Sequence, residues 1–193
     1  MLDNLKKYKV ILASNSPRRK ELLAGLGVDF EVRTLPDVDE SYPDCLQGGD
    51  IPLYISKEKA NAYRNMMQPD ELMITADTIV WMDGEVLGKP KDRDDALRML
   101  RMMSGNTHEV FTGVCLTTVG LQHSFIARTE VRFSLLTEEE IVYYVDNCHP
   151  MDKAGAYGVQ EWIGFIGVES ISGSYYNVMG LPVQKLYREL QNV

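Results

Sequence analysis

The chain has 193 residues, of which 45% are hydrophobic, so it can form one globular domain, or two lobes, with a substantial core. Its 28 acidic and 20 basic residues give a formal net charge of −8, which argues against a nucleic-acid partner held by a broadly basic surface. Cys45, Cys115 and Cys148 lie far apart and predict neither a disulfide framework nor a thiolate metal site.

The first residues, 1–9, mix charged and polar side chains and lack the apolar core of a signal peptide. No apolar run in the chain approaches the roughly 18 residues that would span a bilayer. Together with the unpaired cysteines, these features predict a cytoplasmic protein with no membrane partner.

A buried strand that leads directly into a helix is predicted near the start of the chain. Residues 10–13 are apolar, Ser16 stands where a helix N-cap is expected, and Pro17 occupies the first helical position, where its missing N–H costs nothing. Leucines then follow at helical spacing until Gly27, which we expect to end the helix.

The N-terminus of this helix is a candidate phosphate site. Free backbone N–H groups and the positive end of the helix dipole attract an anion, and Arg18 and Arg19 would add planar donor groups that match phosphate oxygens. The alternative is a surface helix that merely begins with basic residues.

The rest of the chain alternates between strand and helix patterns, which is typical of an α/β fold. The expected elements in chain order are a strand over 29–35, an exposed acidic loop over 36–50, a helix over 51–67, strands over 71–76, 79–82 and 85–87, a helix over 92–103, strands over 109–119 and 124–135, and helices over 138–145 and 181–190. Asp83-Gly84 favours a tight hairpin turn, and Ser104-Gly105 is a plausible helix end. No repeat or linker-like tract interrupts the chain, so we expect one α/β domain over residues 1–193.

Two carboxylates are candidates for chemistry. Asp77, followed by Thr78, stands between two apolar runs at the end of a predicted strand, where α/β proteins usually bind ligands. The alternative is an Asx turn that closes the strand. Glu40 in the acidic loop could act as a second carboxylate, although such loops are often simply solvated. Two carboxylates near phosphates favour a magnesium site.

Lysines provide further candidate phosphate ligands. Residues 84–90 superficially resemble a phosphate-binding loop, but the glycine spacing is one residue short and Pro90 stands where a metal-binding Ser or Thr would be required. Lys89 on this turn could still direct one ammonium group at a phosphate. Lys57 and Lys59 lie on a predicted helix rich in Lys and Glu, where lysines usually face water.

The remaining polar signals are weaker. His108, His123 and His149 have no zinc-ligand spacing, and no serine-nucleophile motif is present. Residues 152–160 and 173–182 combine glycines with amide and hydroxyl groups, which could bind a flat heterocycle or could form ordinary turns.

Taken together, these motifs resemble the Maf proteins, a family of nucleoside triphosphate pyrophosphatases, along nearly the whole chain. The segments that carry the resemblance are Ser14 to Leu23, Asp39-Glu40, Lys59-Ala60, Ala76 to Thr78, Gly88 to Pro90, Ser104-Gly105, Thr112 to Val114, Asp152 to Gln160 and Gly173 to Pro182. The resemblance implies an α/β fold with a mixed central sheet flanked by helices, in two lobes around a deep cleft, similar to the inosine-triphosphate pyrophosphatases. It also implies a homodimer.

The resemblance further implies hydrolysis between the α- and β-phosphates of a nucleoside triphosphate, with a divalent cation, Mg²⁺ or Mn²⁺, as cofactor. Asp77 would be the general base, and Glu40 and Asp77 would hold the metal. The triphosphate would be bound by six side chains: Ser14, Ser16, Arg18, Arg19, Lys59 and Lys89.

Substrate choice is implied by Thr78, which follows the catalytic Asp in the subgroup that acts on dTTP and UTP, together with Arg18 and Gln160. The Gln160 amide can both donate to and accept from a pyrimidine edge. The alternatives are the subgroup that acts on 7-methyl-GTP and a nucleotide-binding regulator of cell division without turnover. A single-stranded nucleic-acid binder is disfavoured by the acidic charge.

Overall fold

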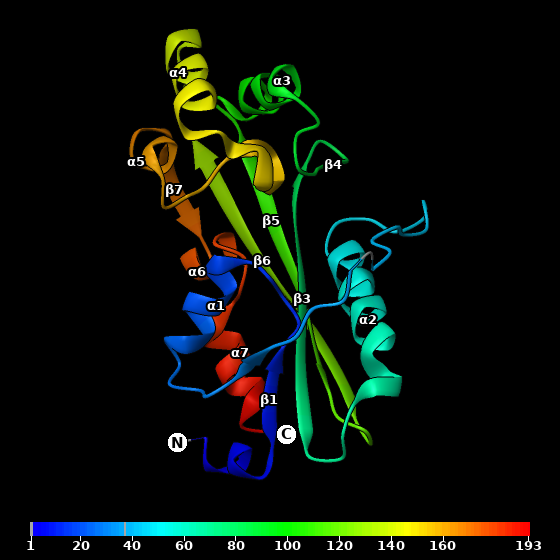
Figure 1. The fold of residues 1–193 in the computed structure, drawn as a ribbon. Coiled ribbons are helices and arrows are strands. Elements are labelled where there is room, and N and C mark those ends of the chain that lie inside the picture. The colour runs from blue at the N-terminus through cyan, green and yellow to red at the C-terminus, as the bar shows by residue number, and fades with distance from the viewer. Residues whose placement is uncertain (1, 37) are drawn as a thin grey trace. The chain divides into compact units, whose positions relative to one another are not determined.

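A mixed β-sheet flanked by helices forms the framework of the computed structural model, which describes residues 2–36 and 38–193 (Figure 1). The sheet order is β2-β1-β3-β5-β6-β7, with β4 paired to β3. The strands are β1 Lys9–Leu12, β2 Glu31–Val32, β3 Glu71–Met82, β4 Glu85–Leu87, β5 Thr107–Thr117, β6 Gln122–Phe133 and β7 Val168–Ser172. β1 runs parallel to β2 and β3, whereas β3–β4 and β6–β7 are antiparallel. The predicted α/β class with a mixed sheet is confirmed.

Seven α-helices connect or follow these strands in the described part of the chain. They are α1 Pro17–Ala24, α2 Asp50–Tyr63, α3 Arg93–Met103, α4 Glu138–Cys148, α5 Trp162–Gly167, α6 Tyr175–Val178 and α7 Val183–Leu190. Short 3-10 helices cover Asp3–Lys7, Arg64–Met66, Pro150–Asp152 and Ala154–Ala156.

Several local predictions are confirmed. Asp83 and Gly84 have φ of 51° and 84° and close the β3–β4 hairpin, in which Met82 pairs with Glu85. α3 covers Arg93–Met103, close to the predicted 92–103, and Gly105 follows the end of that helix with φ of 69°. These predictions are correct because each depends only on residues that are close together in the sequence.

Other predictions are wrong. The strands expected over 71–76 and 79–82 are one strand, β3, so Asp77 lies within a strand instead of ending it. The polar residues Asp77 and Thr78 do not end the strand, because backbone pairing does not require apolar side chains. β3 pairs with β1 as far as Ile74 and with β4 from Val80 onward. The first helix ends at Ala24, with Gly25 as C-cap, and the strand expected over 29–35 is reduced to two residues.

Four further differences concern short or unpatterned segments. The helix expected over 51–67 ends at Tyr63 and continues as a 3-10 turn. α5, β7 and α6 were not predicted, because segments of four to six residues carry too little periodicity to be recognised. By contrast, the loop predicted over 36–50 is confirmed for its described residues, which contain no strand and no helix before Asp50; Asp37 lies outside them.

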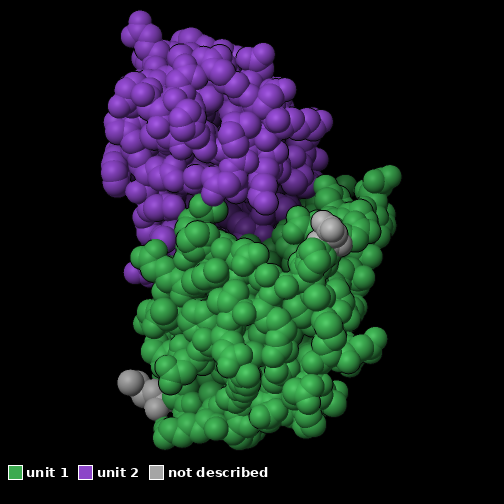
Figure 2. Space-filling view, in the orientation of Figure 1, with its two compact units in different colours: residues 1–77, 112–127, 180–193 green, residues 78–111, 128–179 purple. Residues whose placement is uncertain are grey.

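The chain divides into two compact units (Figure 2). Unit 1 comprises residues 1–77, 112–127 and 180–193, and unit 2 comprises residues 78–111 and 128–179. Three of the four boundaries fall within β3, β5 and β6, and the fourth lies between α6 and α7. The cleft that the family resemblance implies stays a prediction.

In unit 1, α1 and α7 lie on one side of the strands and α2 lies on the other (Figure 1). Ile11, Tyr63, Met67 and Met73 form a buried cluster between α2 and the strands. The buried Glu71 carboxylate accepts two hydrogen bonds from the Arg33 guanidinium, at 2.9 and 2.6 Å, and so ties the start of β3 to the residue after β2.

In the core of unit 2, the apolar stripe of α3 packs against α4 and the end of β6. His108 on β5 is buried within it, and its Nε2 lies 2.7 Å from Tyr157 Oη. The imidazole ring also contacts Phe133 edge to face. Burial lowers the pKa of His108 from 6.5 to about 4, so this histidine is neutral in the folded protein at pH 7.

His108 should make the stability of unit 2 depend on pH. The unfolded chain takes up a proton on this ring near pH 6.5 and the folded chain only near pH 4, so the stabilisation is complete above pH 6.5 and is lost as the pH falls toward 4. We expect His108→Gln to remove about 2 kcal/mol of the decrease in unfolding free energy between pH 7 and pH 5. Urea unfolding at both pH values measures this difference. An equal loss of unfolding free energy in wild type and variant would contradict the assignment of the pH dependence to His108.

Candidate active site

Lys59 on α2 contacts two carboxylates at once. Its Nζ lies 2.8 Å from Asp77 Oδ1 and 2.8 Å from Glu40 Oε1. The side chains of Lys59 and Asp77 are only 13% and 14% exposed, whereas that of Glu40 is 58% exposed. The alternative that Lys59 is a solvated surface lysine is therefore wrong, and so is the alternative of an Asx turn at Asp77, because Asp77 lies within β3.

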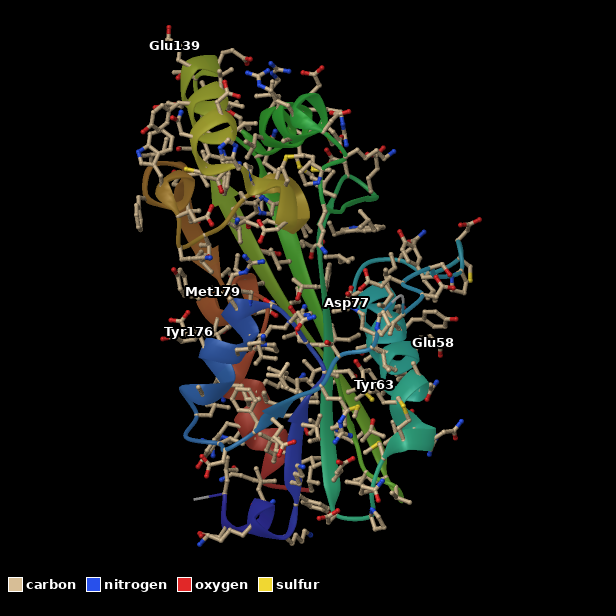
Figure 3. The ribbon with its side chains drawn as sticks, viewed as in Figure 1. Glu58, Tyr63, Asp77, Glu139, Tyr176 and Met179 are labelled. Atoms are coloured by element: carbon tan, nitrogen blue, oxygen red, sulfur yellow. The ribbon has the colours of Figure 1, made fainter. Side chains whose placement is uncertain are left out.

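The register between α2 and β3 brings this ion pair together. Thr75 Oγ1 on β3 donates to the Ser56 carbonyl on α2 at 2.7 Å, and Thr75 and Asp77 share one face of the strand. Ser56 and Lys59 are one helical turn apart on α2. The hydrogen bond between Thr75 and Ser56 therefore brings Lys59 beside Asp77. Figure 3 shows Asp77 on β3 beside α2.

A second close contact holds α2 against the sheet. Gly113 on β5 has no side chain, and a Cβ there would lie 2.3 Å from the Pro52 carbonyl oxygen at the start of α2. Only glycine permits the helix to approach this closely. The position of Lys59 beside Asp77 thus depends on contacts with two neighbouring strands.

The N-terminus of α1 is built as the sequence predicts. Ser16 is the N-cap, and its Oγ accepts a hydrogen bond from Arg19 N at 3.4 Å, while Pro17 is the first helical residue. Ser14 Oγ accepts from Ser16 N at 3.2 Å, which folds the preceding residues into a tight turn. Arg18, on the first turn of the helix, is half-buried.

Arg19 links this helix to the site on β3. Its Nε donates to the Gly180 carbonyl and its Nη1 to the Ala76 carbonyl, both at 2.9 Å. Loss of solvent lowers the pKa of the Arg19 guanidinium, and the charges of Asp77, Arg18 and Glu40 also act on it. An arginine stays protonated in proteins, so Arg19 is a fixed positive charge beside the peptide that precedes Asp77.

Unit 1 therefore brings together seven of the predicted site residues: Ser14, Ser16, Arg18, Arg19, Glu40, Lys59 and Asp77. The other three belong to unit 2. Thr78 is half-buried on the opposite face of β3 from Asp77, Lys89 is exposed after β4, and Gln160 is half-buried in the turn before α5.

The carboxylates of Asp77 and Glu40 suit a magnesium-type cation. Both contact the same Lys59 nitrogen, so their oxygens converge on one region, and such a cation needs only one or two carboxylates when phosphate oxygens supply the other positions. Within the described ranges, no group of three or more His, Cys, Asp or Glu side chains forms a denser metal site.

Sequence analysis did not identify Tyr144 and Glu161, which contact each other at 2.5 Å in unit 2. Glu161 directly follows Gln160, and this adjacency was the only available signal. Tyr144 carries no signal in the sequence, because it stands among the apolar residues of a helix.

Across the described residues, no helix combines the length and the apolar character that a membrane crossing requires.

The fold and the site define an α/β protein that has a carboxylate pair, a bridging lysine and a basic helix N-terminus suited to a polyphosphate and a cation. A family model described as Maf-like protein matches residues 9–193. The chain belongs to the Maf-like protein family.

Two relatives match along the full length. A protein from Bacteroides thetaiotaomicron named dTTP/UTP pyrophosphatase is 70% identical over 193 residues, which cover 100% of both chains. A protein of the same name from Parabacteroides distasonis is 58% identical over 192 residues, again covering 100% of both. Among solved structures, a HAM1 protein from Coxiella burnetii is 13% identical with a TM-score of 0.46, covering 96% of this chain and 100% of that one. The family assignment rests on the sequence matches.

The N-cap of α1 can be tested by its contribution to stability. Ser16→Ala removes the side-chain acceptor for Arg19 N, and we expect a loss of about 1 kcal/mol in unfolding free energy. Ser41→Ala is a suitable control, because the Ser41 hydroxyl donates to the exposed Asp39 carboxylate two residues away in the same loop. Chemical denaturation of both variants makes the comparison, and equal losses would show that Ser16 does not cap the helix.

Proposed function

We propose that this protein hydrolyses the α–β phosphoanhydride of dTTP and UTP, and releases the nucleoside monophosphate and pyrophosphate. The observation that carries the proposal is the contact of Lys59 with Asp77 and Glu40, close to the capped N-terminus of α1. Full-length relatives that bear the name dTTP/UTP pyrophosphatase, at up to 70% identity, support the same activity here.

Asp77 acts as the general base in this proposal. Lys59 donates to Oδ1 at 2.8 Å and so restrains the rotation of the carboxylate, which is then ready to accept a proton from a water molecule. The oxygen of that water forms a new bond to phosphorus while the bond to the bridging oxygen breaks. The proton passes to Asp77, and the electron pair of the broken bond leaves with pyrophosphate.

The cations of the site bind the triphosphate and stabilise the charge that develops on the leaving pyrophosphate. Arg18, Lys59 and Lys89 are the main ligands, with Arg19, Ser14 and Ser16 completing the set. Arg19 is held by the carbonyls of Ala76 and Gly180, so its charge does not have to reorganise during the reaction. Fixed positive groups of this kind are the principal source of catalysis in phosphoryl transfer.

Asp77 and Glu40 would hold a divalent cation, Mg²⁺ or Mn²⁺. When bound, it would neutralise phosphate charge and orient the phosphate oxygens. Glu40 suits this role because its exposed carboxylate lies at the entrance of the more buried Lys59–Asp77 pair.

Base selection is assigned to Arg18, Thr78 and Gln160. An amide such as that of Gln160 can satisfy both a donor and an acceptor on a uracil or thymine edge, and a mismatched base would leave one of these groups unpaired. The homodimer implied by the family resemblance and the predicted cytoplasmic location both stay predictions.

A substrate panel tests the activity. We expect pyrophosphate release from dTTP and UTP with Mg²⁺ or Mn²⁺, slower release from CTP, GTP, ITP and 7-methyl-GTP, and none in EDTA. Faster release from 7-methyl-GTP would favour the other subgroup. Tight nucleotide binding without product at any metal concentration would overturn the enzymatic proposal and favour a regulator.

The role of Asp77 has its own test. Asp77→Asn removes the proton acceptor but leaves Lys59 paired with Glu40, so we expect turnover to fall about 10²–10⁴-fold while nucleotide affinity changes by less than about tenfold. Asp70→Asn changes an exposed carboxylate just before β3 and serves as the control. Steady-state kinetics and calorimetry measure the two quantities. Near-normal turnover of Asp77→Asn would remove this residue from the role of base.

A further inference from the structure

A buried polar network ties down the segment that carries Gln160. Lys153 Nζ lies 3.0 Å from Glu161 Oε1, and the Lys153 side chain is only 10% exposed. On the other side of the same carboxylate, Tyr144 Oη on α4 donates to Glu161 Oε2 at 2.5 Å. Gly158 N in turn donates to Tyr144 Oη at 3.1 Å. Lys153, Glu161, Tyr144 and Gly158 thus form one chain of bonds, which we call the Glu161 network.

The Glu161 carboxylate lies directly against the turn that precedes it. A Cβ on Gly158 would lie 2.7 Å from Glu161 Cδ, so a side chain at position 158 would displace the carboxylate. Glu161 N also donates to the Gly158 carbonyl at 2.9 Å, which closes the turn. Gln160 stands inside this turn, so its backbone is fixed on both sides.

The phenol of Tyr144 is suited to join the carboxylate to the backbone. Burial, followed by the hydrogen bond to Glu161, raises the pKa of Tyr144, so the hydroxyl stays protonated. It therefore donates its proton to Glu161 and accepts from Gly158 N with a lone pair. Replacing either partner would leave a buried polar group unsatisfied.

The same segment is anchored at its other end. Tyr157 Oη bonds to the buried His108, and Gly155 N donates to the Gly88 carbonyl at 3.0 Å. Gly155 has φ of 69°, and a Cβ there would lie 2.9 Å from Val80 Cγ2. The segment thus also bonds to the residue before Lys89, so Lys89 and Gln160 share one support.

The Lys153 and Glu161 side chains are 10% and 27% exposed, and desolvation offsets much of the attraction in such a pair, so its contribution to net stability is small. Lys153 Nζ also lies 2.7 Å from Asp152 Oδ1, so Lys153 has a second carboxylate partner. We propose that Glu161 is a positioning residue that fixes the Gln160 amide for recognition of the pyrimidine edge, and so sets the preference for UTP over purine nucleotides. This inference rests on the proposed function. An amide discriminates between bases only if its donor and acceptor keep one orientation, and the network restrains the backbone from which the Gln160 amide extends.

The test compares kcat/KM for UTP with kcat/KM for GTP. We expect Glu161→Ala to lower this ratio about tenfold, mainly through a higher KM for UTP, with pyrophosphate still the product. Glu161→Gln keeps the contact with Tyr144 and should retain most of the preference. Glu139→Ala on α4 is the matched control, because that carboxylate is exposed at the outer end of the helix (Figure 3).

A double-mutant cycle separates positioning from general damage. If Glu161 acts through Gln160, Glu161→Ala should change the ratio in the wild-type background but not in Gln160→Ala. Tyr144→Phe, which removes only the hydroxyl, should shift the ratio in the same direction and decides the matter if Glu161→Ala does not fold.

The outcomes distinguish the two levels of the proposal. A wild-type protein that hydrolyses UTP in preference to GTP, with the ratio unchanged in Glu161→Ala and Tyr144→Phe, overturns the positioning role alone. A full effect of Glu161→Ala in the Gln160→Ala background overturns it as well. A wild-type protein without pyrophosphate release overturns the proposed function and the positioning role together.

Discussion

The ammonium group of Lys59, shared between Asp77 and Glu40, is the interaction on which the site in unit 1 depends. One ammonium group between two carboxylates leaves an excess of negative charge. This excess suits a divalent cation. The pair with Asp77 is mostly buried, so screening by water is weak and its geometry is restrained. Two contacts between α2 and the strands set that geometry. The Thr75 hydroxyl donates to the Ser56 carbonyl, and Gly113 has no side chain that would keep the helix away.

Arg18 and Arg19 look equivalent in the sequence, but the structure gives Arg19 a distinct position. The Arg19 guanidinium donates to two carbonyls on segments far from α1 in sequence, one of them the peptide before Asp77. It therefore joins the helix N-terminus, β3 and the start of the C-terminal segment while keeping its charge near the site. A side chain of this kind serves the fold and the proposed chemistry at once, because a rigid cation stabilises a developing charge better than a mobile one.

In unit 2, residues 152–161 are likewise held by contacts between neighbouring side chains and the backbone. The buried Lys153 lies near both Asp152 and Glu161, and the Glu161 carboxylate accepts from the Tyr144 phenol. Gly155 has φ of 69°, and a Cβ there would lie 2.9 Å from Val80 Cγ2, whereas a Cβ on Gly158 would displace the end of the Glu161 side chain. Glycine is therefore favoured at both positions by the backbone conformation or by the surrounding side chains.

The sequence by itself determined the features that nearby residues control: the α/β class, the Ser16 cap, the helix end at Ser104-Gly105, the Asp83-Gly84 hairpin and, through its motifs, the family. Only the tertiary structure decided that β3 continues through Asp77, that Lys59 is paired instead of solvated, and that Tyr144 and Glu161 hold the turn around Gln160. Caps and turns are fixed by bonds over three or four positions, which a pattern records. The contact between Arg19 and Gly180 joins residues 161 positions apart, and no local pattern encodes which distant groups a folded chain brings within hydrogen-bonding distance.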